Sequence, residues 1–181
     1  MYKISDSKER NIQHMERTEH LDSIRLITEK DDVQLADIIR KNLEKFHLDI
    51  PGTVYFDSQL DHLSSSYTAN PEKRAYFVVE DPTGKVLGGI GIDEFPGFAR
   101  CAEIQKLYLS DEAKGKGLGK ALMETAEEYA VQAGYERLYL ETHTNLEAAI
   151  HLYEKSGFHK IQKPGEVQHS TMNLFFMKEL T

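Results

Sequence analysis

Hydrophobic and polar positions first alternate along the chain and then repeat at helical spacing. Residues 23–28 (SIRLIT) alternate, which predicts a first strand. Asp31 or Asp32 then offers an N-cap for a helix. After a break at Pro51-Gly52, a second short helix is predicted from Asp57 to about Tyr67. The apolar positions are Val33, Leu35, Ala36, Ile39, Leu43 and Phe46 in the first helix, and Leu60 and Leu63 in the second.

Strand-like alternation returns in the middle of the chain and predicts an antiparallel meander. Its three strands cover 75–80 (AYFVVE), 86–93 (VLGGIGID) and 102–109 (AEIQKLYL). The residues between them, Asp81-Pro82-Thr83-Gly84 and Pro96-Gly97, are typical of turns.

The last third of the chain predicts two more helices and three more strands. Apolar positions at helical spacing run from Leu118 to Ala133, and Gly134 ends that helix. A strand over 137–141 follows, parallel to the strand before the helix. Thr144 and Glu147 predict a capping box for a helix running to Ser156. Strands over 158–162 and 171–178 complete an α+β fold, with one mixed, mostly antiparallel twisted sheet of about six to seven strands and flanking helices.

Composition narrows the class of protein. The 181 residues suit one domain, predicted over 23–181 after a polar N-terminal extension over 1–22. A net charge of −8 argues against a nucleic-acid partner, because such proteins need a basic face. The single Cys101 permits no intramolecular disulfide, and no histidine pair has the HExxH metal spacing. These two observations predict no metal. No apolar run approaches about 18 residues, so we expect no membrane partner and a cytoplasmic location.

The segment with the clearest chemistry is a glycine-rich loop between the third meander strand and the next helix. Gly115, Gly117 and Gly119 alternate with other residues, so a phosphate could approach the backbone amides at a helix N-terminus. A triphosphate P-loop is excluded, because Gly119-Lys120 is followed by Ala121. A dinucleotide-binding fingerprint does not fit, because Gly119 comes one place before the third glycine of that motif and Lys120 stands where Gly or Ala belongs. An ordinary lysine–glycine turn is the simplest alternative.

The residues around the loop resemble a known family. Residues 103–122 (EIQKLYLSDEAKGKGLGKAL) resemble the acetyl-CoA signature of the GNAT superfamily of N-acetyltransferases, and 152–158 (LYEKSGF) resembles its second motif. The resemblance implies a GNAT-like fold in which the backbone of Leu107, Tyr108 and Leu109 splays at a bulge and binds the pantetheine arm of acetyl-CoA. It also implies that the pyrophosphate lies on the loop Lys114, Gly115, Lys116, Gly117, Leu118, Gly119 and Lys120. One position departs from the motif: Leu146 stands where the family has Asn, and Asn145 comes one residue earlier.

Acyl transfer from a thioester to an amine needs a base, donors for the oxyanion and a proton for the thiolate. The second motif makes Tyr153 the candidate acid, although a tyrosine on this apolar stripe could simply be core. Glu103 and Glu141, at positions where family members carry a catalytic Glu, compete as the base, and Glu103 is the favoured one. Each could equally be a strand-end residue in an ion pair. His143 is a third option.

The resemblance predicts an N-acetyltransferase that transfers an acetyl group to a primary amine of a small molecule or peptide, by direct attack through a tetrahedral intermediate. We expect residues 48–67, including Tyr55, Phe56 and Asp57, to line the acceptor pocket with Asp93 and Glu94, which would suit a cationic acceptor. A protein N-terminal or lysine acetyltransferase would need an open groove instead. A non-catalytic acyl-CoA sensor is the third alternative. Either terminal strand could pair with a second chain in a homodimer.

Overall fold

The computed structural model describes residues 22–165, 167 and 169–180. Of the predicted extension over 1–22, all but Asp22 lies outside these residues. One seven-stranded sheet has the order β1-β2-β3-β4-β5-β7-β6. All neighbouring strands are antiparallel except β4 and β5. The strands are β1 (Ser23–Leu26), β2 (Ala75–Glu80), β3 (Val86–Glu94), β4 (Cys101–Leu109), β5 (Arg137–Thr142), β6 (His159–Ile161) and β7 (Leu174–Glu179).

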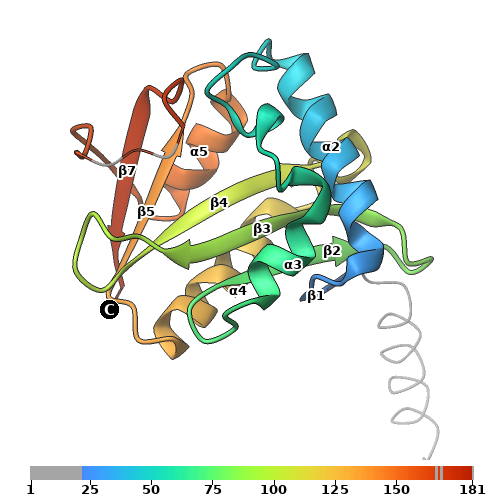
Figure 1. Ribbon diagram of the computed structural model, residues 1–181, viewed down its shortest axis with the longest axis horizontal. Coiled ribbons are helices and arrows are strands. Elements are labelled where there is room, and N and C mark those ends of the chain that lie inside the picture. The colour runs from blue at the N-terminus through green and yellow to red at the C-terminus, as the bar shows by residue number, and fades with distance from the viewer. Residues whose placement is uncertain (1–21, 166, 168, 181) are drawn as a thin grey trace, which may run out of the picture.

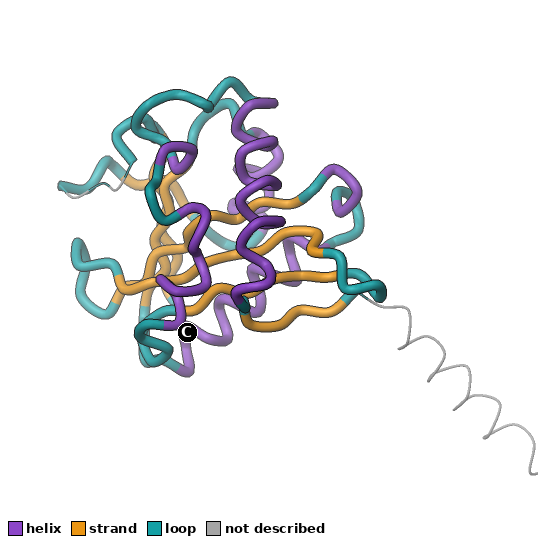
Figure 2. Tube along the Cα trace, turned by 45° about the vertical axis from the view of Figure 1, so that its right-hand side comes forward, coloured by secondary structure: helices purple, strands orange, loops and turns teal. Residues whose placement is uncertain are grey.

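Helices cover both faces of this sheet. They are α2 (Asp32–Lys45), α3 (Leu63–Thr68), α4 (Leu118–Gln132) and α5 (Glu147–Lys155). Figure 1 shows α2 and α3 in front of the strands and α4 behind them. Figure 2 shows the strands in orange and a helix in purple that crosses in front of them. The predicted α+β class with a mixed, mostly antiparallel sheet is confirmed.

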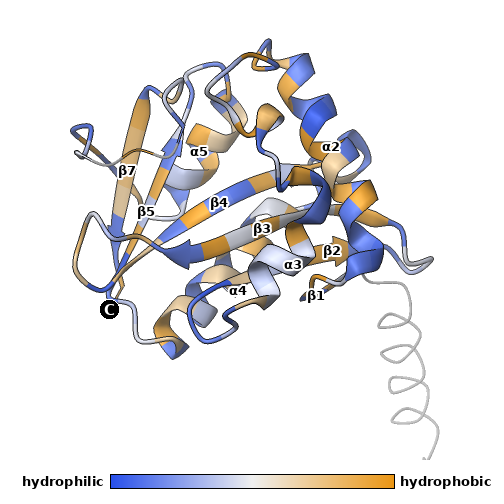
Figure 3. Cartoon of the chain, viewed as in Figure 1, coloured by the Kyte–Doolittle hydropathy of each residue, from blue (hydrophilic) through white to orange (hydrophobic). Residues whose placement is uncertain are grey.

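The front layer is held by the apolar stripe of α2 and by the two leucines of the second helical segment. Leu35, Ile39 and Leu43 are buried against the sheet, as are Leu60 and Leu63. Figure 3 shows α2 with hydrophobic and hydrophilic positions on different sides. The second segment is split into 3-10 turns at Val54–Phe56 and Leu60–His62, followed by α3.

One predicted core position of α2 is wrong. Val33 is 79% exposed, whereas Ile38, which the pattern did not include, is buried. Val33 lies about 200° around the helix axis from Leu35, so the two side chains leave opposite sides of α2.

The back layer is a second core between the sheet and the other two helices. The sheet side chains include Ile90, Ile92, Leu138, Leu140 and Phe176. The residues that α4, α5 and the turn after α5 contribute are Leu122, Met123, Ala126, Ala130, Tyr153 and Phe158.

A third, smaller cluster contains the only cysteine. Cys101 packs with Phe95, Tyr139 and Phe175 and is 1% exposed. Burial raises the pKa of its thiol to about 12, so the thiol is protonated at neutral pH and unreactive.

Two local predictions near the C-terminus are wrong. The capping box does not form, because α5 begins after Leu146 without a side-chain cap and the Thr144 hydroxyl accepts a hydrogen bond from Asn173 instead. The last strand, β7, is not an edge strand, because it lies between β5 and β6. The edges of the sheet are β1 and β6, so only the first strand of the chain keeps the predicted capacity to pair with another chain.

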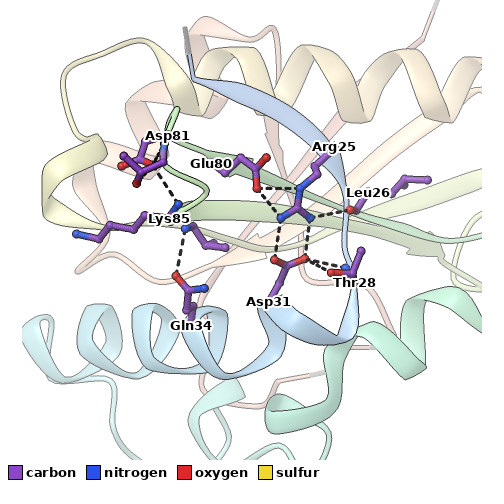
Figure 4. A network of polar contacts seen from close by, with 10 residues as sticks. Arg25, Leu26, Thr28, Asp31, Gln34, Glu80, Asp81 and Lys85 are labelled. Atoms are coloured by element: carbon purple, nitrogen blue, oxygen red, sulfur yellow. Dashed lines mark hydrogen bonds and ion pairs between the residues drawn. The ribbon is translucent and has the colours of Figure 1, made fainter. Parts of the chain in front are cut away.

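An arginine joins the first strand to the sheet and to α2 (Figure 4). Arg25 donates to Glu80 Oε2 over 2.6 and 2.9 Å, and to both oxygens of Asp31 over 2.8 and 2.9 Å. Burial alone would raise the pKa of Asp31, but the hydrogen bonds from Arg25 and Thr28 lower it. The side chain of Asp31 is 3% exposed, so loss of the guanidinium would leave its charge buried without a counterion.

We expect Arg25→Met to destabilise the protein by about 2–3 kcal/mol, less than for a fully buried pair because Arg25 itself is partly exposed. The measurement is the free energy of unfolding in urea. The matched control is Arg40→Met, which removes the more exposed pair with Asp61 and should cost less than about 1 kcal/mol. Equal losses in the two variants would contradict this account.

Candidate active site

The site begins where two parallel strands separate. β4 and β5 pair only at Cys101↔Arg137, Ala102↔Leu138 and Glu103↔Tyr139. Beyond these pairs the strands part, and a cavity of about 190 Å³ lies between β4, β5 and α5. Its walls include the predicted pantetheine residues and others from β4, β5, α5 and the loop before α5: Ile104, Lys106, Leu107, Tyr108, Leu109, Glu141, Thr142, Leu146, Ala149, Leu152 and Tyr153.

A bulge in β4 accompanies the separation. Tyr108 pairs with Gly89 and Gln105 with Gly91, so three residue steps on β4 oppose two on β3. Lys106, inside this interval, has φ 48°, a left-handed conformation that is uncommon for lysine. The resemblance implied a bulge at Leu107–Leu109, and the register break lies at the start of that segment.

The glycine loop lies at one end of this cavity. Gly115 and Gly117 have φ 76° and 77°, and a Cβ atom on either would meet no other atom within 4 Å. Gly119 lines the cavity, and a Cβ there would come 3.2 Å from Leu152 and 3.6 Å from Leu109. The absence of a side chain therefore lets the start of α4 approach both β4 and α5. The first amides of α4 have no partner within the helix, which suits an anionic group.

The three loop lysines differ in their partners. Lys114 is 2.6 Å from Asp111, which Lys45 also contacts at 2.9 Å, and these contacts lower the pKa of Asp111 to about 2. Lys120 lies 3.5 Å from Glu124, and Lys116 is exposed. All three remain close enough to the surface to meet a phosphate.

The loop before α5 is tied to α2 rather than to the cavity. The side-chain amide of Asn145 donates to the carbonyl of Phe46 over 3.0 Å, and no side chain caps α5. The ring of His143 accepts a hydrogen bond from the backbone amide of Asn145, which is a local contact.

A second cavity, of about 370 Å³, lies on the α3 side of β4. Of the predicted acceptor residues, Asp57 and Asp93 line it. Phe56 is 61% exposed, Tyr55 donates to Glu44, and Glu94 pairs with Lys73, so none of these three lines the cavity. The predicted stretch 48–67 also contributes Ser58, Gln59, Leu60, Leu63, Ser66 and Tyr67, whereas Arg74, Gln105, Lys106 and His169 lie outside the predicted acceptor residues.

The two cavities meet at a group of charged side chains. Lys106 lines both cavities. The ring of His169 contacts a carboxylate from each cavity. Its Nδ1 lies 3.3 Å from Glu141, which lines the first cavity, and its Nε2 lies 3.1 Å from Asp57, which lines the second. Burial alone would lower the pKa of His169, but the two carboxylates raise it to about 9. Lys106 Nζ lies 3.9 Å from Asp57, and burial lowers the pKa of this ammonium.

Sequence reasoning missed His169 and Lys106 as site residues. His169 follows no motif, and its partners are 28 and 112 residues away in the chain. Lys106 lay inside the segment that resembles the family signature, but only the bulge turns it between the two cavities.

The two candidate bases lie in different surroundings. Glu141 lines the first cavity and accepts hydrogen bonds from the backbone amide of His169 at 2.9 Å and from the Tyr139 hydroxyl at 3.3 Å. Glu103 is 2% exposed, lines neither cavity and accepts a 2.8 Å hydrogen bond from Gln105. Burial raises the pKa of Glu103 to about 7. Tyr153 lines the same cavity as Glu141, and burial raises the pKa of its hydroxyl, which therefore stays protonated.

Within the described residues, no group of three His, Cys, Asp or Glu side chains is arranged to hold a metal ion. None of the described helices is both long and apolar enough to cross a bilayer.

Comparison with known proteins places this geometry in a family. A sequence model of the acetyltransferase (GNAT) family matches residues 34–158. The uncharacterized N-acetyltransferase YjgM of Escherichia coli is 38% identical over 140 residues, which cover 76% of this chain and 82% of that protein.

Solved structures agree in fold. A GNAT-family acetyltransferase from Staphylococcus aureus superposes with a TM-score of 0.78 at 16% identity, over 89% of this chain and 100% of that one. The PaiA N-acetyltransferase of Thermoplasma acidophilum, solved in complex with coenzyme A, gives a TM-score of 0.70 at 20% identity, over 88% and 99%. With its family signature, its mixed sheet and the separation of β4 from β5, the chain belongs to the GNAT family of acetyltransferases.

Proposed function

We propose that the protein transfers an acetyl group from acetyl-CoA to a primary amine of a small molecule by direct attack. The observation that carries this proposal is the meeting of two cavities at Lys106 and at the Glu141–His169–Asp57 contacts. The first cavity ends at the glycine loop and suits the pantetheine arm. The second would hold the acceptor, so that amine and thioester meet where the cavities join.

The residues around the first cavity fit acetyl-CoA. The pyrophosphate would lie on the backbone amides of the loop Lys114–Lys120, where the helix N-terminus favours negative charge. The arm would then run along Leu107, Tyr108 and Leu109, beside the bulge. A backbone amide freed at the bulge would donate to the thioester carbonyl and stabilise the oxyanion.

Four side chains would control the protons. The cationic Lys106 and His169 lower the pKa of an amine beside them, which favours the neutral, nucleophilic form. Glu141 would take the proton lost from the amine through a water molecule; it lines the cavity, whereas Glu103 does not. The buried Tyr153 hydroxyl would protonate the departing thiolate.

A contact between the segments that precede Asp57 and follow His169 supports a small molecule over a protein acceptor. Thr171 donates its hydroxyl to the carbonyl of Pro51 over 2.8 Å and its amide to that of Gly52 over 3.3 Å. A Cβ on Gly52 would clash with the hydroxyls of Ser170 and Thr171 at 2.5 Å. A protein terminus or lysine would need an open groove where these loops touch.

We expect Tyr153→Phe to lower kcat by about 10²–10⁴-fold, since the thiolate loses its acid, while acetyl-CoA binds as in the wild type. Thiol release measures kcat, and calorimetry measures the dissociation constant. Tyr55→Phe is the matched control and should leave kcat unchanged, because Tyr55 contacts Glu44 outside both cavities. An unchanged kcat in Tyr153→Phe would contradict this role. A wild type that binds acetyl-CoA but acetylates no amine would favour the sensor.

His169 also links the two halves of the site mechanically. Its ring joins the segment before α3, which carries Asp57, to β5, which carries Glu141. Because its pKa in the folded protein is about 9, above the ordinary 6.5, protonation stabilises the fold. This contribution is complete below about pH 6.5 and disappears as the pH rises through 9.

We expect His169→Asn to lower the free energy of unfolding by about 1.5–3 kcal/mol at pH 6, with a deficit that shrinks toward zero near pH 10. Urea unfolding of both proteins at pH 6, 8 and 10 measures the difference. His143→Asn, at a histidine with only a local backbone contact, is the control and should show a small difference at every pH. A deficit for His169→Asn that does not change with pH would show that the ring is not held as a cation.

A further inference from the structure

The acceptor cavity has more basic than acidic side chains in its walls. Arg74, Lys106 and His169 line it together with Asp57 and Asp93. With a pKa of about 9, His169 is protonated at neutral pH, so the described part of the lining carries three formal positive charges and two negative ones. The whole chain, in contrast, carries −8.

Both carboxylates of this cavity already have cationic partners. Asp57 contacts His169 at 3.1 Å and Lys106 at 3.9 Å. Asp93 lies 3.2 Å from Nε of Arg74 and accepts a 2.8 Å hydrogen bond from the amide of Glu94. Each carboxylate therefore has a cation beside it in the folded chain, which weakens the case for a cationic acceptor.

The cations, in contrast, have N–H donors that no described residue accepts from. A guanidinium has five N–H donors. Among the described residues, Arg74 donates one hydrogen bond, from Nη1 to the carbonyl of Ser66 at 3.2 Å. Its buried Nε lies near Asp93 but makes no well-formed hydrogen bond. Lys106 Nζ is 3.9 Å from its nearest carboxylate in the described chain, which is longer than a hydrogen bond.

The positions of these cations indicate which end of the acceptor lies where the two cavities meet. Lys106 and His169 lie where the cavities meet, so the reacting amine belongs beside them. Arg74 lines only the second cavity and is absent from the walls of the first, where the thioester would lie. A planar guanidinium with free donors is suited to bidentate contact with a carboxylate. A second ammonium on the acceptor would instead meet Arg74 without a free carboxylate nearby.

We infer that the acceptor is an amine that also carries a carboxylate, as an amino acid does, and that Arg74 binds this carboxylate while the amine reaches the cavity junction. The inference rests on the proposed acetyltransferase function. It makes Arg74 a specificity-determining residue that holds the acceptor and takes no part in proton transfer.

The test compares amines that differ only in the acid group. Purified protein and acetyl-CoA are mixed with free amino acids, β-alanine and γ-aminobutyrate, each beside its carboxamide, and with spermidine, and thiol release is followed. We expect kcat/KM for the preferred acid to exceed that for its carboxamide by about 10²-fold or more, because the carboxamide leaves Arg74 without an anion.

The variant Arg74→Met removes the cation and keeps much of the side-chain volume. It should raise KM for the acid by about 10²-fold, change KM for the carboxamide little, and leave the dissociation constant of acetyl-CoA unchanged. Arg74→Lys should restore part of the loss. Arg100→Met is the matched control, because it removes the surface pair with Glu136 and should alter neither KM. If Arg74→Met does not fold, the comparison of acid with carboxamide in the wild type still tests whether the acceptor's carboxylate is recognised.

The outcomes separate the two proposals. Equal rates for acids and carboxamides, or a preference for spermidine, would overturn the carboxylate inference and leave the acetyltransferase function standing. Acetylation of no amine at all would overturn both.

Discussion

The separation of β4 from β5 is the constraint on which the rest of the site depends. Two adjacent parallel strands that stay paired leave no room between them, and here pairing stops at Glu103↔Tyr139. The bulge at Lys106 turns the second half of β4, so that one cavity opens on each side of that residue. Backbone groups freed from the ladder need another partner, and an extended arm with amide groups, such as pantetheine, can supply one. In this proposal the cosubstrate completes the sheet locally.

Most of the fold could be predicted from the sequence because its signals are local. Period-two and period-3.6 patterns located the strands and α2, α4 and α5 to within a few residues, and the glycine loop marked the start of α4. The errors arose where a tertiary contact outweighed a local preference. Thr144 could cap α5 but contacts Asn173 instead. Val33 is a different error, because it lies on the side of α2 opposite to Leu35 and faces solvent. The position of the last strand in the sheet depends on long-range pairing that no local pattern encodes.

The site residues also differ in whether the sequence could identify them. Tyr153 and Glu141 were found through the family resemblance and do line one cavity, whereas Glu103, the base that the sequence favoured, is buried beside Gln105 and lines neither cavity. His169 joins segments far apart in the chain, so only coordinates reveal its partners. Charge pairing in the cavity also depends on the fold. Asp57 and Asp93 suggested a cationic acceptor, but in the folded chain each lies beside a base, which no sequence pattern indicates.

The buried cysteine has a consequence for an enzyme whose product is itself a thiol. Each turnover of an acetyl-CoA-dependent transfer releases free CoA, and an accessible protein thiolate could be trapped by oxidised CoA as a mixed disulfide. Cys101 is enclosed by Phe95, Tyr139 and Phe175, and its pKa of about 12 leaves almost no thiolate at neutral pH. With no other cysteine in the sequence, the chain offers oxidised CoA no attachment point, so its folded form should tolerate swings in the redox state of the CoA pool.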